Sequence, residues 1–142
     1  MPFDSIPERP RMLTTSEILE AAAAIVKQGW CQCTAAKDIH GDGVDPTSRH
    51  AVAWCASGAI QRAAGVYFGY GDRGLEHELA EEALEAFNDF LHSQKNVPEE
   101  YQAFQWNDHQ YRRFGIGRRR VAKALRQAAA LERAKEMVCA TA

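Results

Sequence analysis

The chain alternates between segments with a helical spacing of apolar residues and polar segments with no regular period. The first periodic segment starts after Thr14, whose spacing to Glu17 is that of a capping box. The apolar positions that follow share one face of a helix: Ile18, Ala22, Ile25 and Val26. Gly29 is expected to end this helix in a left-handed conformation, so Trp30 and Cys31 should lie just beyond it in a loop.

A polar loop and a second helix are predicted next. Residues 31–45 show no period, and the segment from His40 to Gly43 has the composition of a turn. Asp45 and Pro46 are suited to the cap and first position of a helix that would run to about Ala63. This reading places Cys55 on the buried stripe, well inside the helix.

The second half of the chain predicts two more helices, separated by a second long loop. Residues 75–92 keep an apolar face opposite a row of glutamates, and a last helix is expected from about Arg118. The intervening loop, residues 104–117, contains Trp106, Asn107 and Asp108. The expected fold is therefore all-α, a compact bundle of about four helices with two long loops, in a single domain over residues 14–142 after an extended arm over residues 1–13.

Length and composition agree with one globular domain. The chain has 142 residues, of which 46% are hydrophobic and 25% are charged. Its longest purely apolar run, residues 21–26, is far shorter than the roughly 20 residues that cross a bilayer. The first residues show no apolar core of a signal peptide, so we expect a cytoplasmic protein with reduced thiols and no membrane partner.

The net charge of −2 hides two blocks of opposite sign. Residues 72–100 carry nine acidic and two basic side chains, whereas residues 111–142 carry nine basic and two acidic ones. Such blocks can attract each other within the domain, or the basic block can face an anionic partner.

The three tryptophans mark the candidate binding residues, because each adjoins a polar or reactive side chain. The candidates are Trp30, Cys31, Trp54, Cys55, Trp106, Asn107 and Asp108. Buried indoles often serve only as core anchors. The alternative is a pocket or contact surface, because loop residues on a rigid scaffold often bind ligands.

A cysteine-dependent enzyme using Cys31 or Cys55 is a second hypothesis. A cysteine nucleophile needs a lowered pKa and a nearby base, for which His40, His50 and His109 are the candidates. Neither predicted position favours it, because Cys55 is expected inside a helix and Cys31 at a helix C-terminus. The order Cys31, Cys33, His40, His50, Cys55 lacks the paired spacings of structural zinc sites, and no cofactor motif is present, so no metal or cofactor is predicted.

A nucleic-acid or anion site is the third hypothesis. Five arginines are interleaved with aromatic residues in the basic segment: Arg112, Arg113, Arg118, Arg119 and Arg120. Because the sequence pI is only about 6.2, the favoured interpretation is a solvated face that pairs with the acidic helix.

Three short motifs resemble those of a family of small uncharacterised bacterial and phage proteins. They are Gly-Trp-Cys at residues 29–31, Trp-Cys-Ala-x-Gly-Ala at residues 54–59 and Trp-Asn-Asp at residues 106–108. The resemblance brings no established activity, but it groups Cys31, Cys55, Asn107 and Asp108 as a cluster and leaves out Cys33 and His40. The leading hypothesis is a binding module for a protein partner or small ligand, and a phage or mobile-element origin would suit an inhibitor of a host protein.

Overall fold

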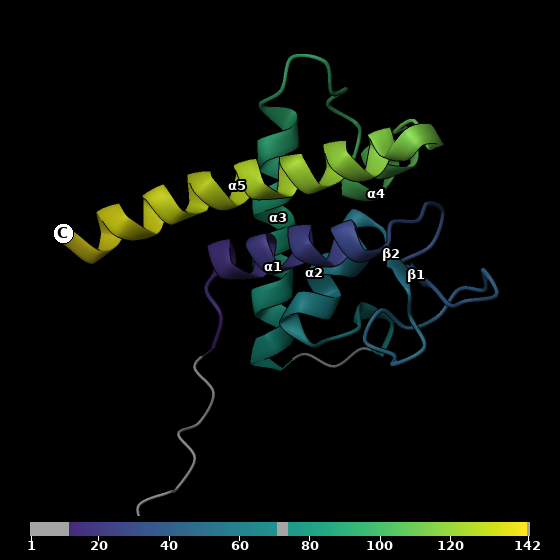
Figure 1. Cartoon of the computed structure of the whole chain (residues 1–142). Coiled ribbons are helices and arrows are strands. Elements are labelled where there is room, and N and C mark those ends of the chain that lie inside the picture. Colours follow the sequence, from purple (N-terminus) through teal and green to yellow (C-terminus); the bar gives the residue numbers. More distant parts are fainter. Residues whose placement is uncertain (1–11, 71–73, 142) are drawn as a thin grey trace, which may run out of the picture.

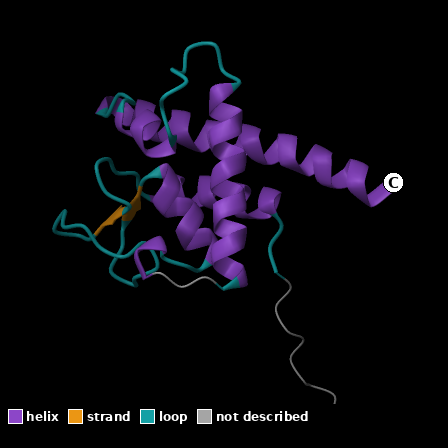
Figure 2. Cartoon of the chain, turned by 180° about the vertical axis from the view of Figure 1, so that it is seen from behind, coloured by secondary structure: helices purple, strands orange, loops and turns teal. Residues whose placement is uncertain are grey.

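A computed structural model describes residues 12–70 and 74–141, which form five α-helices, two 3-10 turns and one short strand pair (Figures 1 and 2). The helices are α1 (Thr15–Gln28), α2 (Ala56–Ala64), α3 (Leu75–His92), α4 (Ala103–Asp108) and α5 (Ile116–Thr141). The 3-10 turns are η1 (Phe68–Tyr70) and η2 (Arg113–Gly115), and the strands are β1 (Ala36–Lys37) and β2 (Ala53–Trp54). The all-α class is confirmed. Most of the expected N-terminal arm, residues 1–11, lies outside the described residues.

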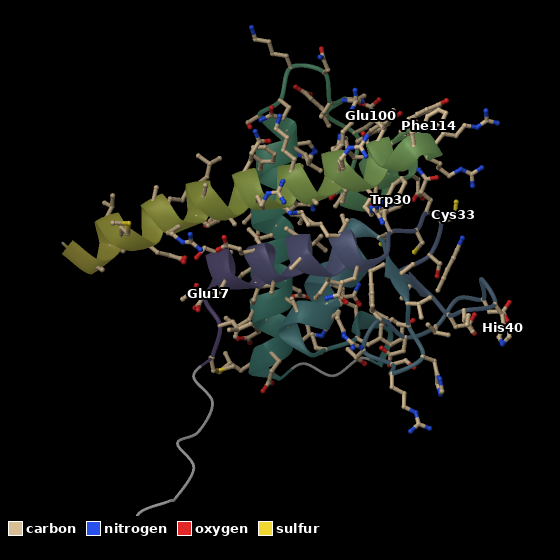
Figure 3. The ribbon with its side chains drawn as sticks, viewed as in Figure 1. Glu17, Trp30, Cys33, His40, Glu100 and Phe114 are labelled. Carbon is tan, nitrogen blue, oxygen red and sulfur yellow. The ribbon has the colours of Figure 1, made fainter. Side chains whose placement is uncertain are left out.

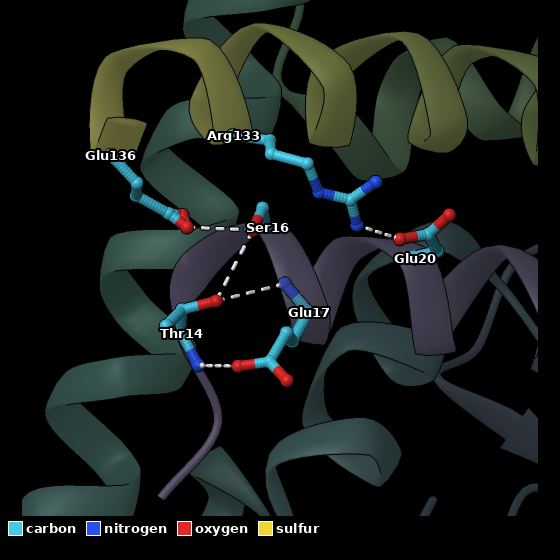
Figure 4. Close-up of polar contacts among 6 residues, drawn as sticks. All are labelled: Thr14, Ser16, Glu17, Glu20, Arg133 and Glu136. Atoms are coloured by element: carbon cyan, nitrogen blue, oxygen red, sulfur yellow. Dashed lines mark hydrogen bonds and ion pairs between the residues drawn. The ribbon is translucent and has the colours of Figure 1, made fainter. Parts of the chain in front are cut away.

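The most extensive packing between two helices is that of α1 against α5, which run antiparallel (Figure 1). At one end, Ser16 donates a hydrogen bond of 2.6 Å to Glu136, and Arg133 forms an ion pair with Glu20 (Figure 4). At the other end, Gly117 in the first turn of α5 lies against the indole of Trp30. The N-terminus of α5 is therefore held beside the C-terminus of α1.

The core lies where α3 crosses behind α1 and α5 (Figure 1). Its largest fully buried side chains come from all four long elements: Ile18, Leu19 and Val26 of α1, Ile60 of α2, Phe87 and Leu91 of α3, and Val121 and Leu125 of α5. α3 has the bounds predicted from its apolar stripe. None of the described helices has the length and apolar character needed to span a membrane.

The predicted start of α1 is confirmed, but its predicted end is wrong in detail. Thr14 and Glu17 form the capping box, with the Glu17 amide donating to Thr14 Oγ1 and the Thr14 amide donating to Glu17 Oε1 (Figure 4). Gly29 is extended, with φ −170°, and not left-handed. The position suits glycine for another reason, because a Cβ there would lie 2.0 Å from the carbonyl oxygen of Val52.

The predicted second helix begins about ten residues too early. Asp45 accepts hydrogen bonds from the amide and hydroxyl of Thr47, which closes a turn and does not cap a helix. The chain then forms β2, which pairs with β1 and bridges to Trp30, and α2 starts only after Cys55. The structure thus contains a strand pair that the sequence interpretation did not predict, although the ladder is only two residues long.

The segment around Trp106 is a helix and not the loop that the sequence predicted. At the start of α4 the amide of Gln102 donates to Gln105 Oε1 at 2.7 Å, and Asn88 of α3 accepts the amide of Ala103 at 2.8 Å. Trp106, Asn107 and Asp108 form its last turn. α5 starts at Ile116, within two residues of the predicted position.

Close backbone packing at Gly58 gives a first testable prediction. A Cβ on Gly58 would lie 1.8 Å from the carbonyl oxygen of Ala35, so the backbone itself must move to accept it. We expect Gly58→Ala to lower the free energy of unfolding by about 2–3 kcal/mol, since overpacking typically costs about 1–3 kcal/mol. Gly43→Ala is the control, because its Cβ would meet only the side-chain hydroxyl of Thr34 at 3.1 Å. Equal urea midpoints for the two variants would contradict the contact.

Candidate functional site

The side chain of Asn107 joins three segments that lie far apart in the sequence. Its Oδ1 accepts from Trp30 Nε1 at 2.8 Å and from the amide of Ala56 at 3.0 Å. Its Nδ2 donates to the carbonyl of Cys31 at 3.0 Å and to Asp108 Oδ1 at 3.2 Å. Asn107 is 0% exposed. Every donor and acceptor of this buried amide is therefore used, as a buried polar group requires.

Gln32 fastens the same junction from the other side, and the sequence interpretation did not single it out. Its Nε2 lies 2.9–3.1 Å from the carbonyl oxygens of Asn107, Asp108 and Gln110, at the C-terminal end of α4. Carbonyls at the end of a helix lack partners within it, and of these three the Asn107 carbonyl also accepts the amide of Gln110 at 3.2 Å. Cys33 has a positive φ of 72°, and its amide donates to Asp108 Oδ1 at 2.9 Å. No local sequence pattern signals such a contact, since it joins residues 75 or more positions apart.

The three tryptophans have different surroundings. Trp54 is 4% exposed, and its Nε1 donates to the carbonyl of Pro46. Trp30 is half-buried between Asn107 and α5, and Trp106 packs edge-on against Phe87 with ring centroids 5.9 Å apart. The indoles thus do not line one common pocket. Figure 3 shows Trp30 at the same end of the molecule as Cys33 and Phe114.

Three of the four cysteines, Cys31, Cys33 and Cys55, lie near Asp108, and Cys31 and Cys55 are buried. Cys33, Cys55 and Asp108 line a hollow of about 190 Å³, and Cys31 lies beside it. Contrary to the sequence expectation, Cys55 is the N-cap of α2, where its Sγ accepts the amide of Gly58 at 3.3 Å.

Burial suppresses the reactivity of both inner thiols. Burial, with a smaller effect from Cys55, raises the pKa of Cys31 to about 12. Burial also raises the pKa of Cys55, although its hydrogen bonds from backbone amides of α2 oppose the shift. Neither group is a thiolate near neutral pH, so neither has the form in which cysteine acts as a nucleophile.

No histidine in the described part of the chain is hydrogen-bonded to a cysteine. His109 binds the carbonyl of Gln105 through Nδ1 and the hydroxyl of Tyr101 through Nε2. His40 and His50 are exposed on loops. Over residues 12–70 and 74–141, no three His, Cys, Asp or Glu side chains are grouped as metal ligands.

The basic residues form a groove between α1 and α5. Five cations line a hollow of about 510 Å³, and we call it the cationic groove: Lys27, Arg118, Arg119, Lys123 and Arg126. Within the described residues none of the five is ion-paired; the nearby ion pairs of α5 are those of Arg133 with Glu20 and of Lys135 with Glu132. The expected pairing with the acidic helix, α3, is therefore not seen. Lys27 was not singled out in the sequence, because it lies 91 or more positions before the other four.

The basic segment before α5 is also exposed. Phe114 is 80% exposed and adopts a positive φ of 60°, which is uncommon for a residue with a side chain. Arg112, Arg113 and Tyr111 beside it are exposed as well. The five arginines found in the sequence thus divide: Arg118 and Arg119 face the cationic groove, while Arg112, Arg113 and Arg120 lie outside it.

The three motifs that meet at Asn107 all fall inside one match to known sequences. The profile of a family of unknown function, DUF6197, matches residues 10–131. The chain belongs to this family. We found no match among curated proteins or among solved structures. The DUF6197 match includes the Asn107 junction and the cationic groove, and it stops before the last residues of α5.

Removal of the Asn107 side chain should destabilise this DUF6197 protein. Asn107→Ala leaves Trp30 Nε1, the Ala56 amide and the Cys31 carbonyl without their partner. Because a buried unsatisfied group costs about 1–3 kcal/mol, we expect a loss of about 3 kcal/mol or more in the free energy of unfolding. The exposed Asn96→Ala control should stay within about 0.5 kcal/mol of the parent in the same denaturation experiment. A silent Asn107→Ala variant would contradict the junction.

The raised pKa values predict which thiols react. A thiol reagent should label the exposed Cys33 and Cys139 first, and Cys31 and Cys55 only after unfolding. Because the pKa of Cys31 is about 12, raising the pH from about 7 to about 9 should leave its labelling slow. The decisive sample is the Cys33→Ser, Cys139→Ser double variant, followed by mass spectrometry. Rapid labelling of this variant in its folded state would instead support a reactive inner cysteine.

Proposed function

We propose that the protein is a binding module, and that the cationic groove binds a nucleic acid. The observation that carries the proposal is the gathering of five cations without ion-pair partners around one hollow. A groove lined by one sign of charge concentrates the opposite charge, and backbone phosphates of nucleic acids are bound in this way by lysine and arginine.

The surroundings of the groove support the same ligand. Arg118 and Arg119 lie in the first turn of α5, where the helix dipole adds to the positive potential. The exposed ring of Phe114 and the exposed Tyr111 lie just before this turn, and proteins that bind single strands combine cations with aromatic rings in this manner. The net charge of −2 does not oppose local binding, because the acidic side chains are concentrated on another element, α3.

A protein-binding surface around Trp30 is a second candidate. A hollow of about 430 Å³ lies beside Trp30 and Cys31, and Ile39 on its lining is 81% exposed. An exposed aliphatic side chain beside a concave surface is a feature of protein contacts. If the gene is of phage or mobile-element origin, such a contact would suit an inhibitor of a host protein. We rank it second because only one exposed aliphatic side chain lines this hollow, whereas five cations line the cationic groove.

A cysteine-dependent enzyme ranks last, because both candidate nucleophiles are buried and their pKa values are raised. We place the protein in the cytoplasm, where reducing conditions suit its free thiols. This location also gives access to nucleic acids.

Binding of labelled oligonucleotides at increasing salt tests the nucleic-acid proposal. Affinity should fall with salt, with a log–log slope of about −0.7 for each single-strand phosphate that is neutralised. The variant Arg119→Gln, Arg126→Gln should weaken binding and reduce the slope by about 1.4, since two such contacts are lost.

The matched control is Arg49→Gln, Lys135→Gln, which removes two exposed cations outside the groove. It should bind like the parent, and both variants should keep the parental melting temperature. If neither DNA nor RNA binds even at low salt, the proposal is wrong and the Trp30 surface becomes the leading candidate. Equal losses in the two variants would show nonspecific attraction without a groove.

A further inference from the structure

A second hollow lies on the other flank of α5 from the cationic groove. It measures about 530 Å³ and is enclosed by the end of α3, the segment that follows, α4 and α5. We call it the aromatic hollow; its apolar wall is formed by Phe90, Leu91, Val97, Pro98, Trp106 and Ala124. No carboxylate is among its described lining residues. Its size lies within the range of about 300–1,000 Å³ typical of ligand pockets.

The aromatic side chains of this hollow are held in place before any ligand arrives. Tyr101 lies on the ring of His109, with centroids 4.8 Å apart and an angle of 35° between the planes. The Tyr101 hydroxyl is 3.2 Å from His109 Nε2, and His109 Nδ1 is 2.8 Å from the carbonyl of Gln105. Trp106 is fixed edge-on by Phe87. Rings held in this way lose little entropy when a flat ligand stacks on them.

Uncommitted amides also line the hollow. The side chains of Asn96 and Gln127 line it, and neither side chain has a hydrogen-bond partner within the described residues. A side-chain amide offers a donor and an acceptor together, which is what the edge of a nucleobase requires. An apolar wall, fixed rings and free amides form a site for a flat polar heterocycle.

Lys123 connects this hollow to the cationic groove, because it lines both. Arg120 adds a second cation to the aromatic hollow. A single nucleic-acid strand whose phosphates cross the outer face of α5 at Lys123 could therefore place a base in the aromatic hollow. A duplex could not, since its bases are paired and stacked inside the helix.

We infer that the aromatic hollow binds an unpaired nucleobase, so that the ligand of the cationic groove is a single-stranded nucleic acid. This inference rests on the proposed function and specifies its substrate class. Bases of single strands are commonly stacked on aromatic side chains and read at their edges by polar groups, while the sugar-phosphate chain follows a cationic surface.

The test compares four ligands of equal length: single-stranded DNA, RNA of the same sequence, the corresponding DNA duplex, and a DNA strand with abasic sites. We expect DNA or RNA single strands to bind about tenfold more tightly than the abasic strand, a size typical of one stacked base. The duplex should bind more weakly than the better single strand. A preference between DNA and RNA would identify the natural strand.

Substitutions in the hollow test whether the base binds there. Tyr101→Leu removes the ring but keeps apolar volume, and we expect it to bind the base-carrying and abasic strands equally. Gln127→Leu, at an exposed position of α5, removes one of the amides of the hollow and should lower the preference; it serves as a second test if Tyr101→Leu does not fold. Phe104→Leu is the matched control, because this exposed ring of α4 lies outside both the hollow and the cationic groove, and it should keep the tenfold preference.

The outcomes separate the two proposals. If no strand binds, including the abasic one, the proposed function itself fails. If the abasic strand, the duplex and the single strands bind equally, the cationic groove is supported and the base-binding hollow is wrong. The base-binding proposal is also wrong if Phe104→Leu abolishes the preference while Tyr101→Leu and Gln127→Leu retain it.

Discussion

The hydrogen bonds of the buried Asn107 side chain are the constraint on which the arrangement of this end of the molecule depends. One amide, 0% exposed, ties α4 to Trp30, to the backbone of Cys31 and to the first amide of α2. Apolar contacts alone would not hold α4 in this position, because the helix has only six residues and little surface to bury. A short helix that is too small to be stable by itself is thus kept in place by directional bonds.

This junction changes the meaning of the three short motifs. Gly29 to Cys31, Trp54 to Ala59 and Trp106 to Asp108 supply the parts of one hydrogen-bonded structure: an indole donor, a helix N-terminus and the amide between them. The polar groups of these motifs are therefore committed to hydrogen bonds within the fold. The junction in turn holds Trp106 of α4 against Phe87 of α3 and the indole of Trp30 against Gly117 of α5, so the surfaces available for binding lie around it.

The elements predictable from sequence are those whose causes are local. α1 and α3 are examples, because a capping box and an apolar stripe extend over neighbouring residues. The start of α2 and the helical state of Trp106 were not predictable, because β2 pairs with segments 17 and 24 residues earlier and Asn107 binds a residue 77 positions away. The basic arginines were evident in the sequence, but Lys27 joins them only through the packing of α1 on α5.

The same packing explains why the acidic and basic blocks do not neutralise each other. α3 crosses α5 steeply, so only a short part of it approaches α5 (Figure 1). The glutamates of α3 lie between Glu76 and Glu85, in its N-terminal part. α1, which follows α5 for most of its length, presents alanines and other apolar residues to it, and only Glu20 among its described side chains pairs with an α5 cation. At physiological ionic strength, salt screens the attraction between the groove cations and distant carboxylates over about 8 Å. The attraction between a guanidinium and a phosphate in contact with it is screened much less. A chain with a net charge of −2 thereby keeps five cations available on one helix pair.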